Sequence, residues 1–96
     1  MREASFQSKV VKWLRSQGCV VLKYEQNATT HAGVADVFFC KEGFYGFLET
    51  KKSRNAKFQP LQKRFIEKMN EWSYGRVVYP GECWEQVKKE LKEILQ

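Results

Sequence analysis

The chain has 96 residues, of which 43% are hydrophobic and 29% charged, and its 17 Lys and Arg exceed its 11 Asp and Glu. That length fits one domain, residues 1–96, and the aromatic content of seven Phe, four Tyr and three Trp supplies a core and argues against disorder. The three cysteines are widely separated and lack CxxC spacing, which argues against a disulfide framework or a structural zinc site. The sequence has no long apolar run, which argues against a membrane span or a signal peptide. We therefore expect a cytoplasmic protein.

Positive charge is concentrated in one part of the chain. The formal net charge is +6, and residues 51–66 contain six Lys and Arg but no acid. A segment of one sign favours a polyanion as partner, most simply nucleic acid. A solvated helix and loop is the alternative that charge alone leaves open.

The first elements predicted along the chain are a helix and a strand. Residues 3–17 carry apolar side chains at helical spacing from Phe6 onward, and Gly18 is suited to end that helix. The β-branched segment 19–24 predicts a strand, and the small polar residues 25–33 predict a loop.

A hairpin, a helix, a strand and a last helix follow. Residues 35–40 and 44–51 predict antiparallel strands joined by a short turn at 41–43, Pro60 opens a helix, and residues 76–79 predict another strand. The apolar residues expected to face the core from the last two helices are Leu61, Phe65, Met69, Trp72, Trp84, Val87, Leu91, Ile94 and Leu95. The order αβββαβα predicts an α/β fold with a mixed central sheet flanked by helices.

Two carboxylates and a lysine gather at one end of the predicted hairpin. Asp36 begins its first strand and Glu49 ends the second, and antiparallel pairing makes these ends neighbours. Strand alternation puts Lys51 on the face of Glu49, with Thr50 pointing away. Two close carboxylates suit a divalent cation such as Mg²⁺, and a neighbouring lysine suits phosphodiester hydrolysis. A Glu-x-Lys pair alone is also common as solvated charge on an edge strand.

The sequence resembles a known nuclease family at these positions. Residues 33–36 (Gly-Val-Ala-Asp), residues 47–51 (Phe-Leu-Glu-Thr-Lys) and the helical Gln62 are similar to the PD-(D/E)xK nuclease superfamily, and more closely to its VRR-NUC (virus-type replication-repair nuclease) branch. The match runs from residue 3 to about residue 79. One departure is Ala35, where the family commonly has Pro.

The resemblance implies a restriction-endonuclease-like fold with a metal-dependent active site. By this resemblance Asp36 and Glu49 bind Mg²⁺ or Mn²⁺ together with the main-chain carbonyl of Thr50, and Lys51 is the catalytic lysine. Glu3 falls where the family has a helical Glu close to the metal. On its own, a Glu in the first turn of a helix can simply complement the helix dipole.

Further residues are predicted to act around this site. Gln62 falls where the family has a helical Gln near the active site, although a helical Gln can equally be solvated. The residues expected to contact nucleic acid are Lys52, Arg54, Lys57, Lys63, Arg64, Asn27 and His31. Three tryptophans at helical core spacing, Trp13, Trp72 and Trp84, are expected in the core or a dimer interface, and Cys40 is expected to be buried.

The predicted function is a structure-selective DNA endonuclease. The small stand-alone members of the branch that this chain resembles are phage or prophage proteins, and the branch is related to Holliday-junction resolvases. A four-way junction is the first expected substrate, in a bacterial or phage-infected cell. Symmetric cutting of a junction needs two active sites, so we expect a homodimer. The sequence shows no helix-turn-helix or RNP-like pattern, which favours recognition by shape, and we expect no nucleotide cofactor and no membrane partner. The alternatives are a nicking or flap nuclease in a larger repair or packaging assembly, a non-catalytic DNA-binding module, and an RNA-binding protein.

Overall fold

The computed structural model describes residues 3–24, 35–57 and 60–96, with side chains from residue 5 onward. The elements are α1 (Glu3–Ser16), β1 (Val20–Lys23), β2 (Val37–Lys41), β3 (Phe44–Thr50), α2 (Pro60–Trp72), β4 (Gly75–Val78) and α3 (Glu82–Leu95). The order predicted from the sequence is confirmed. In the described ranges, no helix has the length and apolar character that a membrane crossing requires.

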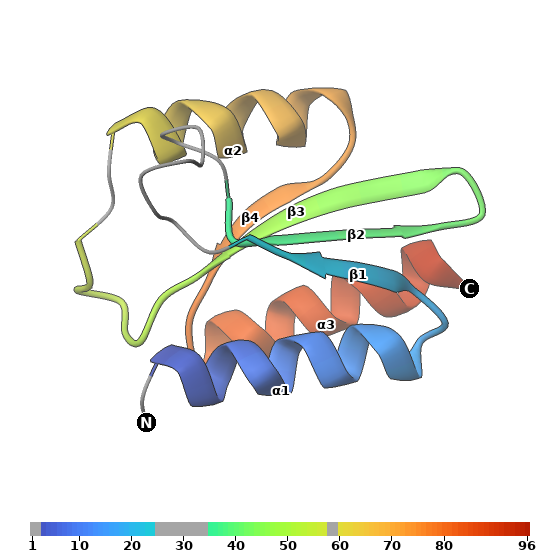
Figure 1. The fold of residues 1–96 in the computed structure, drawn as a ribbon, viewed down its shortest axis with the longest axis horizontal. Helices are drawn as coiled ribbons and strands as arrows, with labels where there is room; N and C mark the ends of the chain where they lie inside the picture. Colours follow the sequence, from blue (N-terminus) through green and yellow to red (C-terminus); the bar gives the residue numbers. More distant parts are fainter. Residues whose placement is uncertain (1–2, 25–34, 58–59) are drawn as a thin grey trace.

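The strands form one mixed sheet in the order β1-β2-β3-β4 (Figure 1). The first three strands are antiparallel, and β4 runs parallel to β3. The hairpin turn is tighter than predicted, because Lys41 pairs with Phe44 and leaves only Glu42 and Gly43 between the strands. Both turn residues have positive φ, 47° and 89°, as a type I′ turn requires. This turn sets the register that brings the other ends of β2 and β3 together.

Helices cover both faces of the sheet. In Figure 1, α1 and α3 lie side by side on one face, while α2 lies on the other and packs on β3 and β4. The ring of Trp84 on α3 meets the rings of Phe6 and Trp13 on α1 edge to face, at centroid distances of 5.9 and 5.5 Å. Trp84 therefore lies in the core, as predicted, and Trp13 is partly buried against it.

The buried face of α2 differs from the predicted one. Gln62 and Ile66 are its buried residues, whereas Leu61 and Trp72 expose 53% and 65% of their surface. Trp72 is therefore not a core residue, and its alternative place in a dimer interface stays a prediction. The face is shifted because a polar residue, Gln62, accepts a hydrogen bond from Lys51, which directly follows β3. Apolar periodicity does not signal such a contact.

Two smaller predictions also need correction. Ile94 is exposed on α3, where Leu91 and Leu95 supply the buried positions. Cys40 is only half-buried. It lies in β2 next to the exposed Val20 of β1, on the part of the sheet that is not beneath α2.

Glycine at the start of β4 fixes how closely α2 approaches the sheet. A Cβ at Gly75 would lie 2.5 Å from the carbonyl oxygen of Ile66 and 2.9 Å from the main-chain nitrogen of Asn70. Both contacts are with the backbone, which has little room to move aside, so only glycine fits here. The close approach places α2, and Gln62 with it, against the sheet.

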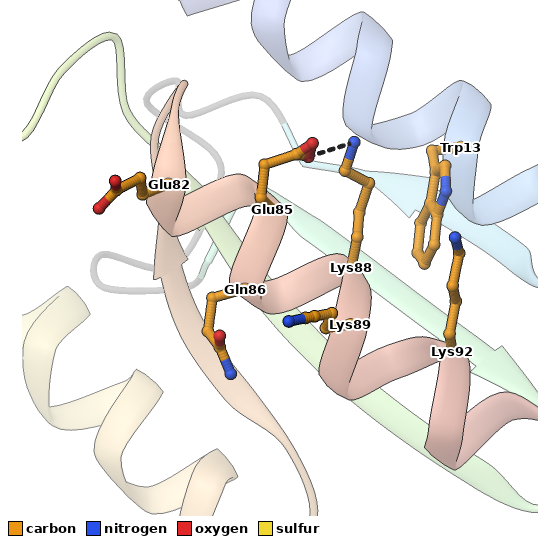
Figure 2. A pocket seen from close by; sticks show the side chains of 7 residues that line it. All are labelled: Trp13, Glu82, Glu85, Gln86, Lys88, Lys89 and Lys92. Atoms are coloured by element: carbon orange, nitrogen blue, oxygen red, sulfur yellow. Dashed lines mark ion pairs between the residues drawn. The ribbon is translucent and has the colours of Figure 1, made fainter.

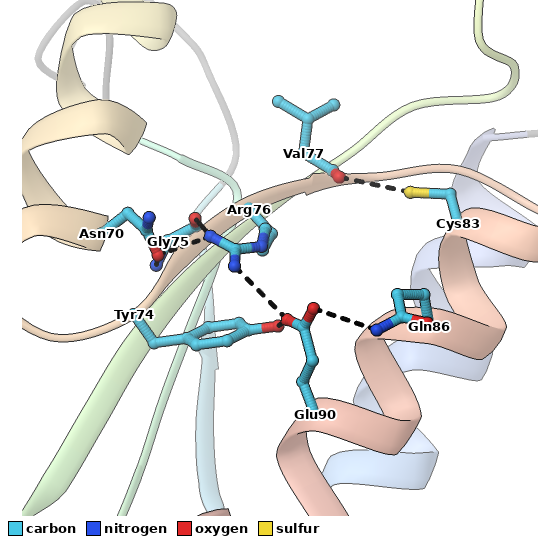
Figure 3. Close-up of polar contacts among 8 residues, drawn as sticks. All are labelled: Asn70, Tyr74, Gly75, Arg76, Val77, Cys83, Gln86 and Glu90. Carbon is cyan, nitrogen blue, oxygen red and sulfur yellow. Dashed lines mark hydrogen bonds and ion pairs between the residues drawn. The ribbon is translucent and has the colours of Figure 1, made fainter.

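A polar network joins the start of β4 to α3 (Figure 3). The hydroxyl of Tyr74 donates to Oε1 of Glu90 at 2.7 Å, and Arg76 Nη2 lies 3.4 Å from the same oxygen. The hydrogen bond from Tyr74 is the main cause that lowers the pKa of Glu90 below its usual range. Burial, followed by this hydrogen bond, raises the pKa of Tyr74.

Replacing Tyr74 with Phe is expected to lower the free energy of unfolding by about 1–2 kcal/mol near neutral pH. Because the pKa of Glu90 is depressed in the folded protein, the bond's contribution is present above the ordinary Glu pKa of about 4.3 and is lost as the pH falls through the folded-state pKa. Urea unfolding at neutral and acid pH measures the difference. In a Glu90→Gln background the Tyr74→Phe effect should no longer depend on pH, and a pH-dependent effect there would contradict the assignment.

Candidate active site

The two predicted carboxylates meet at the end of the hairpin opposite its turn. Asp36 directly precedes β2, and the pairing of Val37 with Leu48 places it opposite Glu49. The main-chain nitrogen of Asp36 donates to Oε1 of Glu49 at 3.1 Å. Both side chains are buried, with exposed fractions of 9% and 3%. The juxtaposition predicted from antiparallel pairing is therefore present.

Among the residues that the structure describes, three groups donate hydrogen bonds to the carboxylate of Asp36. The main-chain nitrogen of Thr50 donates to Oδ1 at 2.9 Å, the side-chain amide of Gln7 donates to Oδ2 at 3.0 Å, and the Thr50 hydroxyl also donates to Oδ2. Strand alternation turns Thr50 away from Glu49 and Lys51, and its hydroxyl bonds the carboxylate of Asp36. Asp36 lies before the strand, so strand alternation does not dictate which side chains it can meet.

Gln7 was missed by the sequence reasoning. It lies on α1, four residues after Glu3 and next to the buried Phe6. Residues four apart share a helix face, so Gln7 lies on the same face as Glu3. A polar residue beside a buried apolar one was the signal in the sequence that could have identified Gln7. Gln7 links α1 to the carboxylate of Asp36.

Lys51 lies between a carboxylate and an amide. Its Nζ is 3.2 Å from Oε2 of Glu49 and 3.4 Å from Oε1 of Gln62. Its main-chain nitrogen donates to the carbonyl oxygen of Val78 at 2.9 Å, which continues the β3–β4 pairing past the end of β3. The backbone of Lys51 is therefore fixed by the sheet, and its side chain reaches α2.

Burial and like charge shape the electrostatics of this cluster. Desolvation, and then the negative charge of Asp36, raise the pKa of Glu49 to about 7, against the opposing effect of Lys51. A cation near both carboxylates would relieve the same repulsion.

The donors present suit a hard divalent cation. Among the side chains of residues 5–24, 35–57 and 60–96, no group of three or more His, Cys, Asp or Glu is placed to hold a metal. Asp36 and Glu49 therefore supply two carboxylates, and Mg²⁺ typically binds one or two carboxylates while keeping several waters. The oxygen-only donor set and the buried like charges both fit Mg²⁺ or Mn²⁺.

The structure brings together most of the residues predicted for the catalytic site: Asp36, Glu49, Thr50, Lys51 and Gln62. Glu3 begins α1, but its side chain lies outside the described residues, as do Asn27 and His31. The basic residues predicted to contact nucleic acid are exposed, on the segment after β3 and the first turns of α2: Lys52, Arg54, Lys57, Lys63 and Arg64.

Comparison with known proteins identifies the fold. No protein-family model matches the sequence, and no curated protein matches it. A solved structure described as a VRR_NUC domain aligns over 94% of this chain and 94% of its own, with a TM-score of 0.69 and 24% sequence identity. The α/β, restriction-endonuclease-like architecture predicted from the sequence is confirmed, and this chain has the fold of a VRR_NUC domain.

Proposed function

We propose that this protein is a metal-dependent endonuclease that hydrolyses phosphodiester bonds in branched DNA. The observation that best supports this function is the convergence of Asp36, Glu49 and Lys51 at one end of a hairpin, in a chain with the VRR_NUC fold. Two carboxylates for a cation, a cationic donor and an exposed basic segment suit a phosphate substrate.

In this proposal the carboxylates of Asp36 and Glu49 and the main-chain carbonyl of Thr50 hold Mg²⁺ or Mn²⁺. The cation, when bound, polarises the scissile phosphate and lowers the pKa of a water molecule. The oxygen of a water molecule attacks phosphorus and the water gives up a proton, while the bond from phosphorus to the 3′ oxygen breaks and that oxygen takes up a proton. The products are a 5′-phosphate and a 3′-hydroxyl. Thr50 and Gln7 keep the Asp36 carboxylate oriented.

In this proposal Lys51 acts as a hydrogen-bond donor to the phosphate. Its Nζ is placed beside Glu49, where it can approach the phosphate and stabilise the negative charge that builds in the transition state. Gln62 accepts a hydrogen bond from this lysine and is a positioning residue in the proposal. The role proposed for Glu3, close to the metal, rests on the sequence resemblance.

We propose a four-way junction as the first substrate to examine and a homodimer as the active form. Symmetric cutting of a junction needs two active sites, and a twofold dimer is the commonest way to supply them. The proposed location is the cytoplasm of a bacterial or phage-infected cell, where such DNA is available. A nicking or flap nuclease acting within a larger assembly is the competing enzyme function.

A cleavage assay tests the proposal directly. Labelled four-way junction, flap, single-stranded and plain duplex DNA are incubated with Mg²⁺, Mn²⁺ or EDTA, beside an Asp36→Ala control. Paired cuts in the junction that need the metal and are lost in the control are expected. Binding without cutting under every metal condition would instead favour a non-catalytic DNA-binding module, and preference for duplex RNA would favour an RNA-binding protein.

The exposed basic segment is expected to contribute phosphate contacts. Replacing Arg54 and Lys57 together with Ala should weaken DNA binding and reduce the slope of log affinity against log salt by about 1.8, because each phosphate contact contributes about 0.9. Lys68→Ala, on the exposed side of α2, is the control. A slope that does not change in the double variant would mean that DNA follows another path.

A further inference from the structure

A groove runs between α1 and α3, on the face of the sheet opposite α2. Two hollows of about 490 and 430 Å³ lie along it. Lysines from both helices line these hollows, and we call them the groove lysines: Lys9, Lys88, Lys89 and Lys92. Figure 2 shows Lys88 and Lys92 extending from α3 toward α1, with Lys92 beside Trp13. The groove is thus built from both helices.

The groove carries a net positive charge. Against the four groove lysines its lining includes Glu82 and Glu85, and Glu85 Oε2 lies 2.7 Å from Lys88 Nζ. On the α1 side, Lys12 and Arg15 are also exposed, and no acid follows Glu3 along that helix. A basic surface of this kind attracts a polyanion.

The floor of the groove is a packed aromatic cluster. Trp84 is buried and meets Phe6 and Trp13 edge to face. The Nζ of Lys88 lies 5.1 Å from the centroid of the Trp84 ring. Lys88 therefore lies over a closely packed aromatic base.

The groove begins at the end of the sheet that carries the candidate active site. One of its hollows is lined by Phe6, Pro80 and Gly81. Phe6 is next to Gln7, which bonds Asp36. Pro80 and Gly81 follow Val78, whose partner across the sheet is Thr50. In Figure 1 the first turns of α1 and α3 lie at this same end of the sheet.

We propose that the α1–α3 groove binds the phosphate backbone of a second arm of branched DNA. This inference rests on the proposed function. The basic segment 51–57 and the first turns of α2 bind one arm, and the groove binds the other, so the two surfaces meet at the active site from opposite faces of the sheet. A straight duplex lying along one surface leads away from the other, whereas a branched DNA engages both. Selectivity for branched DNA then follows from the positions of the two basic surfaces and requires no contacts with the bases.

The first test separates junction binding from duplex binding. Replacing Lys9 and Lys92 with Gln removes two exposed charges and leaves the Lys88–Glu85 pair in place. We expect the salt slope for a four-way junction to fall by about 1.8, so that the affinity ratio of wild type to variant changes about twelvefold between 50 and 200 mM salt. Straight-duplex binding should not change. The Arg54→Ala/Lys57→Ala variant should weaken both, and Lys68→Gln is the charge-loss control.

A second measurement uses the unmodified protein. Amine acylation followed by mass spectrometry reports which lysines bound DNA protects. Junction DNA should protect Lys9 and Lys92, straight duplex should not, and Lys68 should react equally in all samples. Equal protection by both DNAs, or none by the junction, would overturn the groove assignment. If no DNA binds the wild-type protein at all, the proposed function itself fails, which is a distinct outcome.

Discussion

Replacement of Lys51 with Ala is expected to reduce the rate of DNA cleavage by about 10²–10³-fold, the usual cost of removing one donor that stabilises transition-state charge. Lys51 is held by Glu49 and Gln62 and its backbone is fixed by β4, so the substitution removes the amine without releasing the strand. Affinity for the junction should change little, because the lost interaction strengthens mainly in the transition state.

Single-turnover cleavage and equilibrium binding, measured on the same preparations, separate these effects. Lys68→Ala removes an exposed lysine of α2 that pairs with Glu71 and is the matched control. A Lys51→Ala protein that cuts at the wild-type rate would show that Lys51 does not serve the reaction. Loss of binding in parallel with cutting would assign Lys51 to substrate affinity.

Glu49→Gln and Asp36→Asn are expected to change stability in opposite directions while both abolish cutting. Near pH 8 in EDTA, ionised Glu49 is buried beside Asp36, so its amide analogue should stabilise the fold by on the order of 2 kcal/mol. Asn at position 36 instead places an NH₂ group against hydrogen-bond donors from Thr50 and Gln7. This replacement should lower the free energy of unfolding by about 1–3 kcal/mol.

Thermal unfolding with and without Mg²⁺ measures both effects. The cation should stabilise the wild-type protein by mass action and have a much smaller effect on either variant. If Asp36→Asn is as stable as Glu49→Gln, the three-donor arrangement around Asp36 does not contribute as described. If Mg²⁺ leaves wild-type stability unchanged, the two carboxylates do not form the metal site.

The sequence predicts the hairpin and its carboxylates well because their determinants are local. Asp36 and Glu49 are close in the chain, and a short turn containing Gly43 specifies which residues pair. The helices are harder to predict in detail. Gln7 and Gln62 occupy inward positions because of their hydrogen bonds to Asp36 and Lys51, and an apolar pattern carries no information about polar partners on other elements. Trp72 shows the converse, since helical spacing alone does not distinguish an exposed tryptophan from a core residue.

The glycine at the start of β4 has a consequence for how this protein tolerates mutation. Any side chain at position 75 would push the backbone of α2 away from the sheet, and Gln62 moves with that helix. A random-mutagenesis screen for loss of cleavage should therefore recover substitutions at Gly75, a residue with no chemical function. Homologues that keep the catalytic groups should therefore keep glycine here, although this residue takes no part in the chemistry.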